Sequence, residues 1–191
     1  MPTKDNPSLV DVDWSTIPAP ADDGAARHLD GALLPDVPLR ATDGMRVSLA
    51  ELTGRIVVFA YPRTGRPGQP ALVDDWDQIP GARGCTPQSC AFRDLHAALL
   101  AAGAAHVFGL STQDSEYQRE AVERLHLPYR LLSDADLALT RAIDLPTLQV
   151  AGQILIKRLA LVIDDARIAK VFYPVFPPDR NASDVLAWLR R

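Results

Sequence analysis

The chain has 191 residues, of which 47% are hydrophobic and 23% charged, with a formal net charge of −4. This length fits one domain with a sizeable core, and the composition excludes disordered, fibrous and membrane-embedded proteins. The acidic balance without a Lys/Arg run argues against a nucleic-acid partner. No apolar run exceeds the length of a strand, so we expect no membrane span, no signal peptide and a cytoplasmic location.

Residues 1–27 are predicted to form an N-terminal tail, because their prolines and acidic residues resist helix and sheet alike. Residues 28–191 are predicted to form a single domain. Near its start, residues 34–41 and 45–49 flank the turn Asp43-Gly44. This pattern predicts a short hairpin that extends the domain at a sheet edge.

The continuous apolar run 56–61 predicts a central strand that is buried on both faces. Residues 63–84 follow as a long stretch rich in proline and glycine, and loops of this length inside a domain are usually functional or lid-like. A helix is predicted next, with Thr86 as its N-cap, Pro87 at its first position and its end near Gly103.

The rest of the chain alternates between strand and helix patterns. The predicted elements are, in order, strand 107–110, helix 115–124, strand 129–132, helix 137–143, a hairpin of strands 159–163 and 168–172, and a closing helix 181–189 capped by Asn181. This order predicts an α/β domain with a thioredoxin-like fold, in which helices flank a central mixed β-sheet.

The two cysteines lie close together, at positions 85 and 90. In a reducing compartment such a pair indicates transient redox chemistry or metal binding rather than a permanent disulfide. Cys85 falls just before or in the first turn of the predicted helix, where free backbone N–H groups and the helix dipole favour a nucleophilic thiolate. The alternative for a lone cysteine is a small buried hydrophobic residue.

Within an intact helix, Cα atoms with the spacing of Cys85 and Cys90 lie roughly 8.5 Å apart, which is beyond the about 7 Å that a disulfide tolerates. A disulfide between them therefore requires the first turn to unwind, so oxidation would be coupled to a local conformational change. A zinc site would need two further ligands, and the four histidines lie at no zinc-finger spacing, so we expect no metal.

The segment Gly84–Asp94, which reads GCTPQSCAFRD, resembles the active-site helix of peroxiredoxins of the Q type, also called bacterioferritin comigratory proteins. The likeness continues in the same order along residues 28–191. It implies a peroxidatic role for Cys85, a resolving role for Cys90 and a charge-stabilising role for Arg158. It also implies a peroxide substrate, an intramolecular Cys85–Cys90 disulfide, a thioredoxin-type dithiol reductant and no cofactor. Without the resemblance, Arg158 reads almost equally well as a solvated cation at a strand end.

The chain departs from the family pattern three positions before Cys85, where the family has Thr or Ser and this chain has Ala82. Thr64 and Thr86 are the candidates to supply the missing hydroxyl group. Residues 63–84 look like an insertion relative to the family, and we call them the inserted loop. This loop either covers the peroxide pocket or packs inertly on the surface.

Two functions remain open from the sequence. The first is an enzyme that reduces hydrogen peroxide or organic hydroperoxides. The second is a non-enzymatic redox sensor, in which slow oxidation of the same cysteine pair unwinds the helix and changes a partner surface. The absent hydroxyl residue favours the sensor more than any other feature does. The sequence is equally compatible with a monomer and a homodimer.

Overall fold

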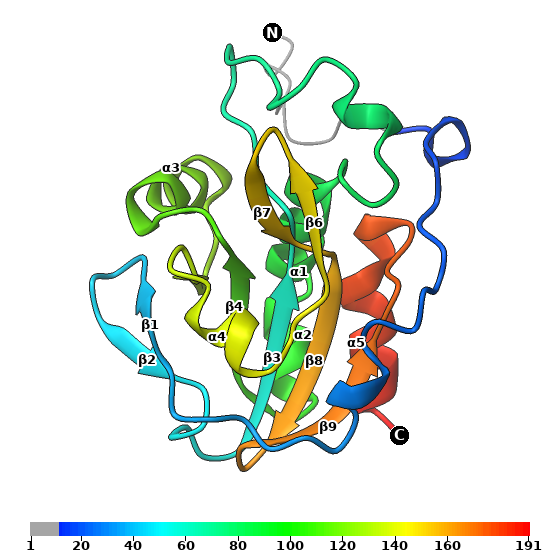
Figure 1. Cartoon of the computed structure of the whole chain (residues 1–191). Coiled ribbons are helices and arrows are strands. Elements are labelled where there is room, and N and C mark those ends of the chain that lie inside the picture. The colour runs from blue at the N-terminus through cyan, green and yellow to red at the C-terminus, as the bar shows by residue number, and fades with distance from the viewer. Residues whose placement is uncertain (1–11) are drawn as a thin grey trace, which may run out of the picture.

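A seven-stranded mixed sheet forms the centre of the computed structural model, which describes residues 12–191 (Figure 1). The strand order is β2-β1-β5-β4-β3-β8-β9, with β3, β4 and β5 parallel and the other pairs antiparallel. Two further strands, β6 and β7, pair as a separate hairpin. The strands are β1 Pro38–Ala41, β2 Arg46–Ser48, β3 Arg55–Ala60, β4 Ala104–Ser111, β5 Arg130–Ser133, β6 Thr147–Val150, β7 Gln153–Ile156, β8 Leu159–Asp164 and β9 Arg167–Phe172.

Helices cover both faces of this sheet. Helices α1, α2 and α5 lie on one face and α4 lies on the other (Figure 1). The helices are α1 Cys85–Asp94, α2 His96–Ala101, α3 Ser115–Leu125, α4 Ala138–Ala142 and α5 Asn181–Leu189, with short 3-10 segments η1 Trp14–Thr16, η2 Arg27–Leu29, η3 Trp76–Gln78 and η4 Pro178–Arg180. None of the helices in this part of the chain has the length and apolar composition needed to cross a membrane.

The chain order of these elements is that of a thioredoxin-like fold. A parallel β3–α1–α2–β4 unit is followed, after β5, by the β8–β9 hairpin and α5, and β3 lies between β4 and β8. The predicted N-terminal hairpin is present as β1 and β2 at one edge of the sheet. The prediction of an α/β domain with a central mixed sheet is therefore confirmed.

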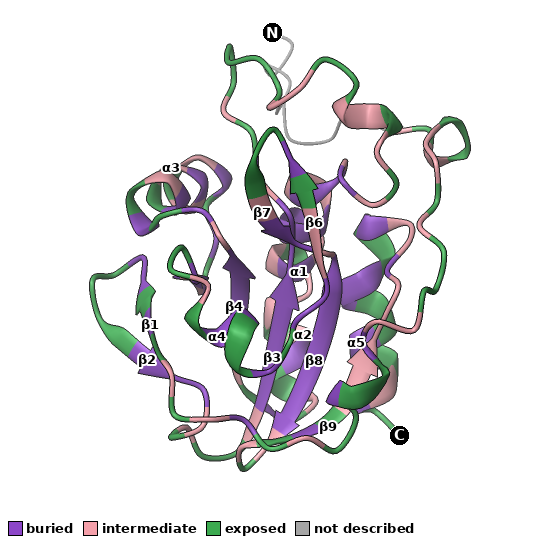
Figure 2. Ribbon diagram, viewed as in Figure 1, coloured by how far each residue is buried: buried purple, intermediate pink, exposed green. Residues whose placement is uncertain are grey.

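Strand β3 is buried on both faces because its side chains alternate between two cores. Ile56 and Val58 belong to the core under α4, whereas Val57 and Phe59 belong to the core under α1, α2 and α5. β3 and β8 accordingly lie in the buried centre of the molecule (Figure 2). The ring of Phe59 stacks on that of Phe92 from α1 at 4.2 Å between centroids, which fixes α1 against the sheet.

The predicted helix after the inserted loop differs from the structure in its start and its continuity. It begins at Cys85 with Gly84 as the N-cap, so the assignment of Thr86 as N-cap was wrong. It is interrupted at Leu95, whose φ of −97° and ψ of 5° are not helical, and this divides it into α1 and α2. Asn181 is likewise the first helical residue of α5 and not its cap.

The β6–β7 hairpin was not predicted from the sequence. Its turn residues, Ala151 and Gly152, both have positive φ values, 48° and 77°, as a two-residue type I′ turn requires. The sequence signal for this hairpin is an alternating pattern that a glycine interrupts. The signal is weak because the stretch lacks the Asn-Gly or Asp-Gly pair that usually marks a two-residue turn. This hairpin stands at the same end of the molecule as the inserted loop (Figure 1).

The described part of the predicted N-terminal tail, residues 12–27, lies against the domain. The Trp14 indole Nε1 donates a hydrogen bond of 2.9 Å to Asp179, and Lys157 pairs with Asp23 at 2.6 Å. Ala26 is buried in the same core as Ile56. The first eleven residues of the predicted tail lie outside the described residues.

Candidate active site

The sheet register brings the sequence-predicted site together. Ala60 at the end of β3 pairs with Leu159 at the start of β8, so Arg158 lies beside the segment that follows β3. Strands β3 and β4 are parallel, and their carboxyl ends therefore meet at the same edge. In α/β sheets the loops beyond this edge are where ligands commonly bind. Cys85, at the start of α1, also lies at this edge.

The Cys85 thiol is placed among groups that stabilise a negative charge. The sulfur accepts a hydrogen bond from the backbone N–H of Arg63 at 3.4 Å and another from the Arg158 guanidinium at 3.3 Å. As a thiol it donates to the Ala82 carbonyl oxygen at 3.5 Å. Because Cys85 is the first residue of α1, the unpaired N–H groups of the first turn and the positive end of the helix dipole add to this field.

Arg158 is the most informative residue of the site. Its side chain is buried, with 3% of the residue exposed, and within residues 12–191 it forms no ion pair with a carboxylate. Buried charges are normally paired. Among its hydrogen-bond partners in this described part of the chain, only Cys85 can carry a negative charge, so a thiolate is the counterion that this arrangement provides. The interpretation of Arg158 as a solvated strand-end cation was wrong.

The guanidinium of Arg158 also shapes the end of the inserted loop. One of its nitrogens, Nη2, lies 3.0–3.2 Å from the carbonyl oxygens of Gly81, Ala82 and Arg83. These three carbonyls point at one nitrogen because the backbone turns around it just before α1 begins. The C-terminal end of the inserted loop is therefore part of the wall around Cys85 and does not pack inertly elsewhere.

Gln88 is a site residue that the sequence reasoning missed. Its side-chain oxygen accepts a hydrogen bond from Arg158 Nη1, and its side-chain nitrogen donates one of 2.9 Å to Asn181 in α5. Gln88 is fully buried and thus ties the first turn of α1 to two other elements. The available signal was a polar side chain three residues after Cys85, on the helix face that also carries Phe92.

The two candidate hydroxyl residues do not take the place of the family threonine. The buried Thr64 hydroxyl donates to Gln113 Oε1 at 3.1 Å, and the Thr64 backbone is held by the same amide through its N–H and its carbonyl. Thr86 is half-buried, and its hydroxyl makes no hydrogen bond within the described residues. The segment after β3 instead reaches the sulfur through the Arg63 backbone N–H, which Gln113 positions by holding Thr64.

Cys90 occupies different surroundings in the same helix. It is buried in the core beneath α1, and this burial raises the pKa of its thiol. Both thiols are free, and both residues belong to one intact helix, α1. Cys90 is therefore a neutral thiol at neutral pH, out of reach of Cys85 until the helix unwinds. In the described part of the chain, no three His, Cys, Asp or Glu side chains are grouped as a metal site.

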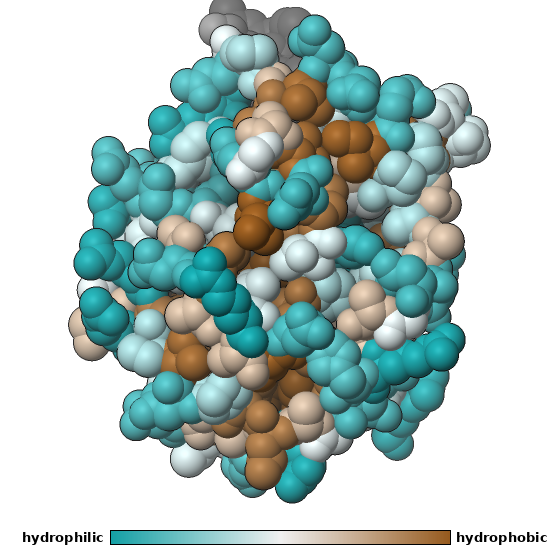
Figure 3. Space-filling view, in the orientation of Figure 1, coloured by the Kyte–Doolittle hydropathy of each residue, from teal (hydrophilic) through white to brown (hydrophobic). Residues whose placement is uncertain are grey.

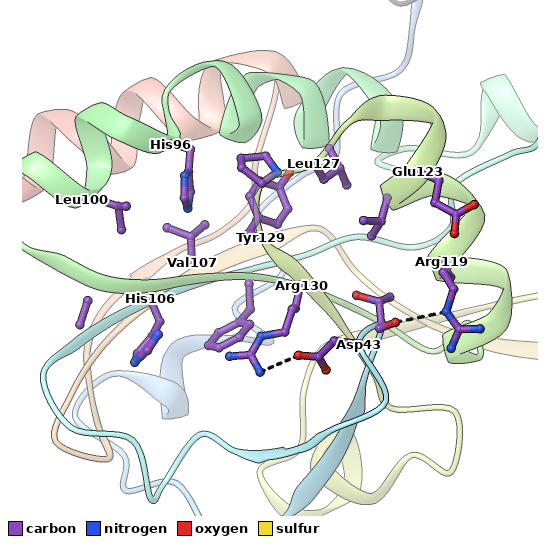
Figure 4. A pocket seen from close by; sticks show the side chains of 15 residues that line it. Asp43, His96, Leu100, His106, Val107, Arg119, Glu123, Leu127, Tyr129 and Arg130 are labelled. Carbon is purple, nitrogen blue, oxygen red and sulfur yellow. Dashed lines mark hydrogen bonds and ion pairs between the residues drawn. The ribbon is translucent and has the colours of Figure 1, made fainter.

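A shallow groove of about 600 Å³ lies between α2 and α3, lined by residues that include His96, Arg119 and Tyr129 (Figure 4). Neither cysteine lines it. Tyr129 donates a hydrogen bond of 2.6 Å to the carbonyl oxygen of Ser89, the residue before Cys90. The groove therefore borders the turn of α1 that carries Cys90, and Tyr129 holds this turn in its helical position.

Gly84 is expected to tolerate no side chain. It has a φ of 107°, and an added Cβ would lie 2.5 Å from Pro178 and 2.8 Å from the Trp14 ring. Gly84→Ala should lower the free energy of unfolding by about 2–4 kcal/mol, from left-handed strain plus overpacking. Gly103→Ala is the matched control, because Gly103 has a φ of 102° but open space around it. Equal losses in urea unfolding for the two variants would contradict the packing argument.

One thiol of α1 lies beside a buried cation, and the other lies in an apolar core. On a thioredoxin-like fold, such a pair of thiols indicates the class of thiol-dependent oxidoreductases. The Redoxin family model matches residues 29–188. A chloroplastic peroxiredoxin Q of Suaeda salsa is 30% identical over 167 residues, which cover 86% of this chain and 69% of that protein. The chloroplastic peroxiredoxin Q of Gentiana triflora is 28% identical over 166 residues, 86% of this chain and 68% of that protein.

Solved structures give the same result. Peroxidoxin BcpB from Mycobacterium tuberculosis superposes with a TM-score of 0.67 at 28% identity, over 84% of this chain and 96% of that one. Peroxiredoxin Q of Xanthomonas campestris superposes with a TM-score of 0.66 at 24% identity, over 84% and 97%, a likeness of fold. The chain belongs to the Redoxin family, as a peroxiredoxin of the Q type, and is a thiol peroxidase.

Proposed function

We propose that Cys85 is the peroxidatic cysteine of this chain. The Cys85 thiolate attacks one oxygen of a hydroperoxide, the O–O bond breaks, and Cys85 becomes a sulfenic acid. The leaving hydroxide or alkoxide takes up a proton and departs as water or an alcohol. Negative charge develops on the leaving oxygen, and the Arg158 guanidinium and the Arg63 N–H, which already contact the sulfur, are in position to stabilise it.

Cys90 resolves this intermediate in the proposed cycle. Its thiol condenses with the Cys85 sulfenic acid to form an intramolecular disulfide and one water. The spacing within α1 requires the first turn to unwind before this step, which breaks the Gln88 contacts to Arg158 and Asn181. Unwinding also exposes Cys90 to water and removes the burial that raises its pKa, so the thiol becomes reactive only when it is needed.

The cycle closes with an external reductant, which we propose to be a thioredoxin-type dithiol. Such a dithiol reduces the Cys85–Cys90 disulfide by thiol–disulfide exchange and is itself oxidised to a disulfide. This makes the protein an atypical two-cysteine peroxiredoxin, with no cofactor and no metal. A donor of this kind is kept reduced in the cytoplasm, which we propose as the compartment.

The observation that carries this proposal is the buried Arg158 guanidinium, whose hydrogen-bond partner capable of negative charge is the Cys85 sulfur. The test is a coupled assay that follows peroxide consumption with thioredoxin, thioredoxin reductase and NADPH. Repeated turnover is expected. Oxidation of both thiols with no turnover would contradict a peroxidase and support the redox sensor.

Cys90→Ser is expected to separate the first oxidation from the rest of the cycle. The first turnover, followed in stopped flow, should keep its rate within about twofold, because Cys90 contributes no hydrogen bond to the Cys85 sulfur. Turnover with thioredoxin should then cease, and mass spectrometry should show Cys85 progressing to sulfinic acid. Sustained thioredoxin-dependent turnover of this variant would show that another group resolves the intermediate.

A further inference from the structure

The segment that follows β3 is held in place by Gln113, which lies between β4 and α3. The Gln113 side-chain oxygen accepts hydrogen bonds from the Thr64 N–H at 3.0 Å and from the Thr64 hydroxyl at 3.1 Å. Its side-chain nitrogen donates to the Thr64 carbonyl oxygen at 3.1 Å. Both residues are buried, with 6% of Gln113 and 1% of Thr64 exposed. One side-chain amide therefore pairs with both backbone polar groups of Thr64, as a neighbouring strand would.

Gln113 is itself fixed by the sheet. Its backbone N–H donates to the Ser111 hydroxyl at 3.3 Å, at the end of β4. Its carbonyl oxygen accepts a hydrogen bond of 2.7 Å from the Ser133 hydroxyl, at the end of β5. The side-chain amide has one productive orientation, because a flipped amide would set its NH2 group against the Thr64 N–H and its oxygen against the Thr64 carbonyl. Gln113 thus connects the sheet to residue 64 in one geometry.

Helix α3 holds the residues on either side of Thr64. Its outer surface is mainly hydrophilic (Figure 3), and Tyr117 is partly buried at the border of this surface. The guanidinium carbons of Arg63 and Arg66 lie 4.9 and 4.0 Å from the centroid of the Tyr117 ring. Such stacking of a guanidinium on an aromatic ring is attractive. The start of the inserted loop is therefore held by the β4–α3 segment through both backbone and side chains.

The position of Thr64 determines where the Arg63 N–H points. Only the φ and ψ angles of Arg63 separate this N–H from the peptide group that Gln113 holds, and the Arg63 side chain is itself held by Tyr117. The Arg63 N–H donates to the Cys85 sulfur at 3.4 Å. Among the described residues, the only other side chain or loop N–H that donates to this sulfur is Arg158, and no hydroxyl group does so. Loss of the Arg63 direction would therefore remove one of two such donors.

We propose that Gln113 is a positioning residue for peroxide reduction, which acts on Cys85 through Thr64 and the Arg63 N–H. The inference rests on the proposed function and adds to it a residue that contacts no reacting atom. The Gln113 amide keeps the Arg63 N–H directed at the sulfur. There this donor stabilises the thiolate and faces the charge that develops as the O–O bond breaks. The Thr64 hydroxyl has the smaller part, because it supplies only one of the three hydrogen bonds to Gln113.

The test uses Gln113→Met, which fills a similar volume but makes none of these three hydrogen bonds. Outright removal of a donor to a developing oxyanion costs about 10²–10³-fold, and a donor that only loses its direction should cost less. We expect kcat/KM for hydrogen peroxide to fall roughly tenfold. In a Cys90→Ser background at a fixed neutral pH, the ultraviolet absorbance of the Cys85 thiolate and the rate of its alkylation by iodoacetamide should also fall.

Gln118→Met is the matched control, since it makes the same chemical change at another buried amide. Gln118 donates to the Ser111 hydroxyl and to the Leu132 carbonyl oxygen. Within residues 12–191 it makes no hydrogen bond to the inserted loop or to Cys85. This variant should lose stability in urea unfolding but keep the thiolate absorbance and both rates within about twofold of those of the unsubstituted chain.

Thr64→Val removes only the hydroxyl bond, so its loss of kcat/KM should be smaller than that of Gln113→Met. A larger loss in Thr64→Val would overturn the proposal, because the hydroxyl would then act on the peroxide directly. If Gln113→Met does not fold, Gln113→Asn takes its place. Its amide is one methylene shorter and cannot keep both backbone bonds to Thr64, so the same three decreases are expected.

The outcomes separate this proposal from the proposed function. Unchanged turnover, absorbance and alkylation in a folded Gln113→Met would overturn the positioning role and leave the peroxidase standing. Equal decreases in Gln113→Met and Gln118→Met would overturn it as well, because the effect would then be one of general destabilisation. If the unsubstituted chain turned over no peroxide while absorbance and alkylation still fell in Gln113→Met alone, the peroxidase would be overturned and Gln113 would remain the residue that positions the donor to the thiolate.

Discussion

Cys85→Ser is expected to abolish peroxide turnover, with a fall in kcat/KM of at least about 10³-fold, because a neutral hydroxyl replaces the nucleophilic thiolate. The serine hydroxyl is smaller than the thiol, so it fits the same space beside the same neighbours, Arg63, Ala82 and Arg158. The variant should therefore fold normally and still bind peroxide. Peroxide consumption in the thioredoxin-coupled assay measures the loss, and thermal unfolding checks the fold.

Cys90→Ser is the matched control, since it makes the same chemical change five residues along the same helix. The two variants should differ in the first turnover, which Cys90→Ser retains and Cys85→Ser loses. A first turnover in Cys85→Ser at the rate of the unsubstituted chain would mean that Cys90 is the nucleophile. That result would contradict the assignment made from the surroundings of the two thiols.

Arg158→Ala is expected to have the next largest effect, a fall in kcat/KM of roughly 10²–10³-fold, as is found when a preorganised donor to a developing oxyanion is removed. The substitution removes the cation 3.3 Å from the sulfur and the donor to Gln88. Arg158→Lys keeps the charge, but its single ammonium group cannot replace the planar fork. It should recover only part of the rate.

A second measurement distinguishes a role of Arg158 in the reaction from a merely structural role. At a fixed neutral pH, alkylation of Cys85 by iodoacetamide should also slow in Arg158→Ala, because the thiolate loses its counterion. Arg46→Ala, at an exposed residue of β2, is the control and should leave both rates unchanged. If Arg158→Ala lowered stability in urea unfolding but left peroxide reduction and alkylation at their original rates, Arg158 would be structural only.

Arg158 connects the end of the inserted loop to the buried Cys85. The Gly81–Arg83 carbonyls, at the end of the inserted loop, accept hydrogen bonds from Arg158, and the Ala82 carbonyl also contacts the Cys85 thiol. One residue thus positions the wall around Cys85 and contacts the nucleophile. For this reason substitutions at Arg158 are expected to change both the reactivity of Cys85 and the position of the end of the inserted loop.

Much of the site was accessible from the sequence because its strongest signals are local. Cys85 at a helix start and Cys90 five residues later depend only on short-range patterns. Arg158 was assigned through resemblance to the family, since a single arginine before an apolar strand carries no signal of its own. Gln88 has a weaker local signal, a polar residue on an apolar helix face, and it is fully buried there.

The remaining contacts have no sequence signal because they join distant segments. The Arg63 N–H meets the Cys85 sulfur across 22 residues of loop, and Thr64 meets Gln113 across 49 residues. Neither Thr64 nor Thr86 replaces the family hydroxyl, because the hydroxyl of Thr64 is taken by Gln113 and that of Thr86 faces no partner among the described residues. The direction of the backbone and the competition between side chains for hydrogen bonds therefore decide where these two hydroxyl groups lie.

The sequence by itself determined the α/β domain, the buried central strand and the helix that carries both thiols, because hydrophobic periodicity and helix-start chemistry act over a few residues. The tertiary structure alone decided what surrounds Cys85. The register between β3 and β8 brings Arg158 to the carboxyl end of β3, and the end of the inserted loop turns three carbonyl oxygens toward its guanidinium. A buried guanidinium needs a counterion among the groups that the fold places beside it. For Arg158 this group is the Cys85 sulfur, 73 residues away in the chain.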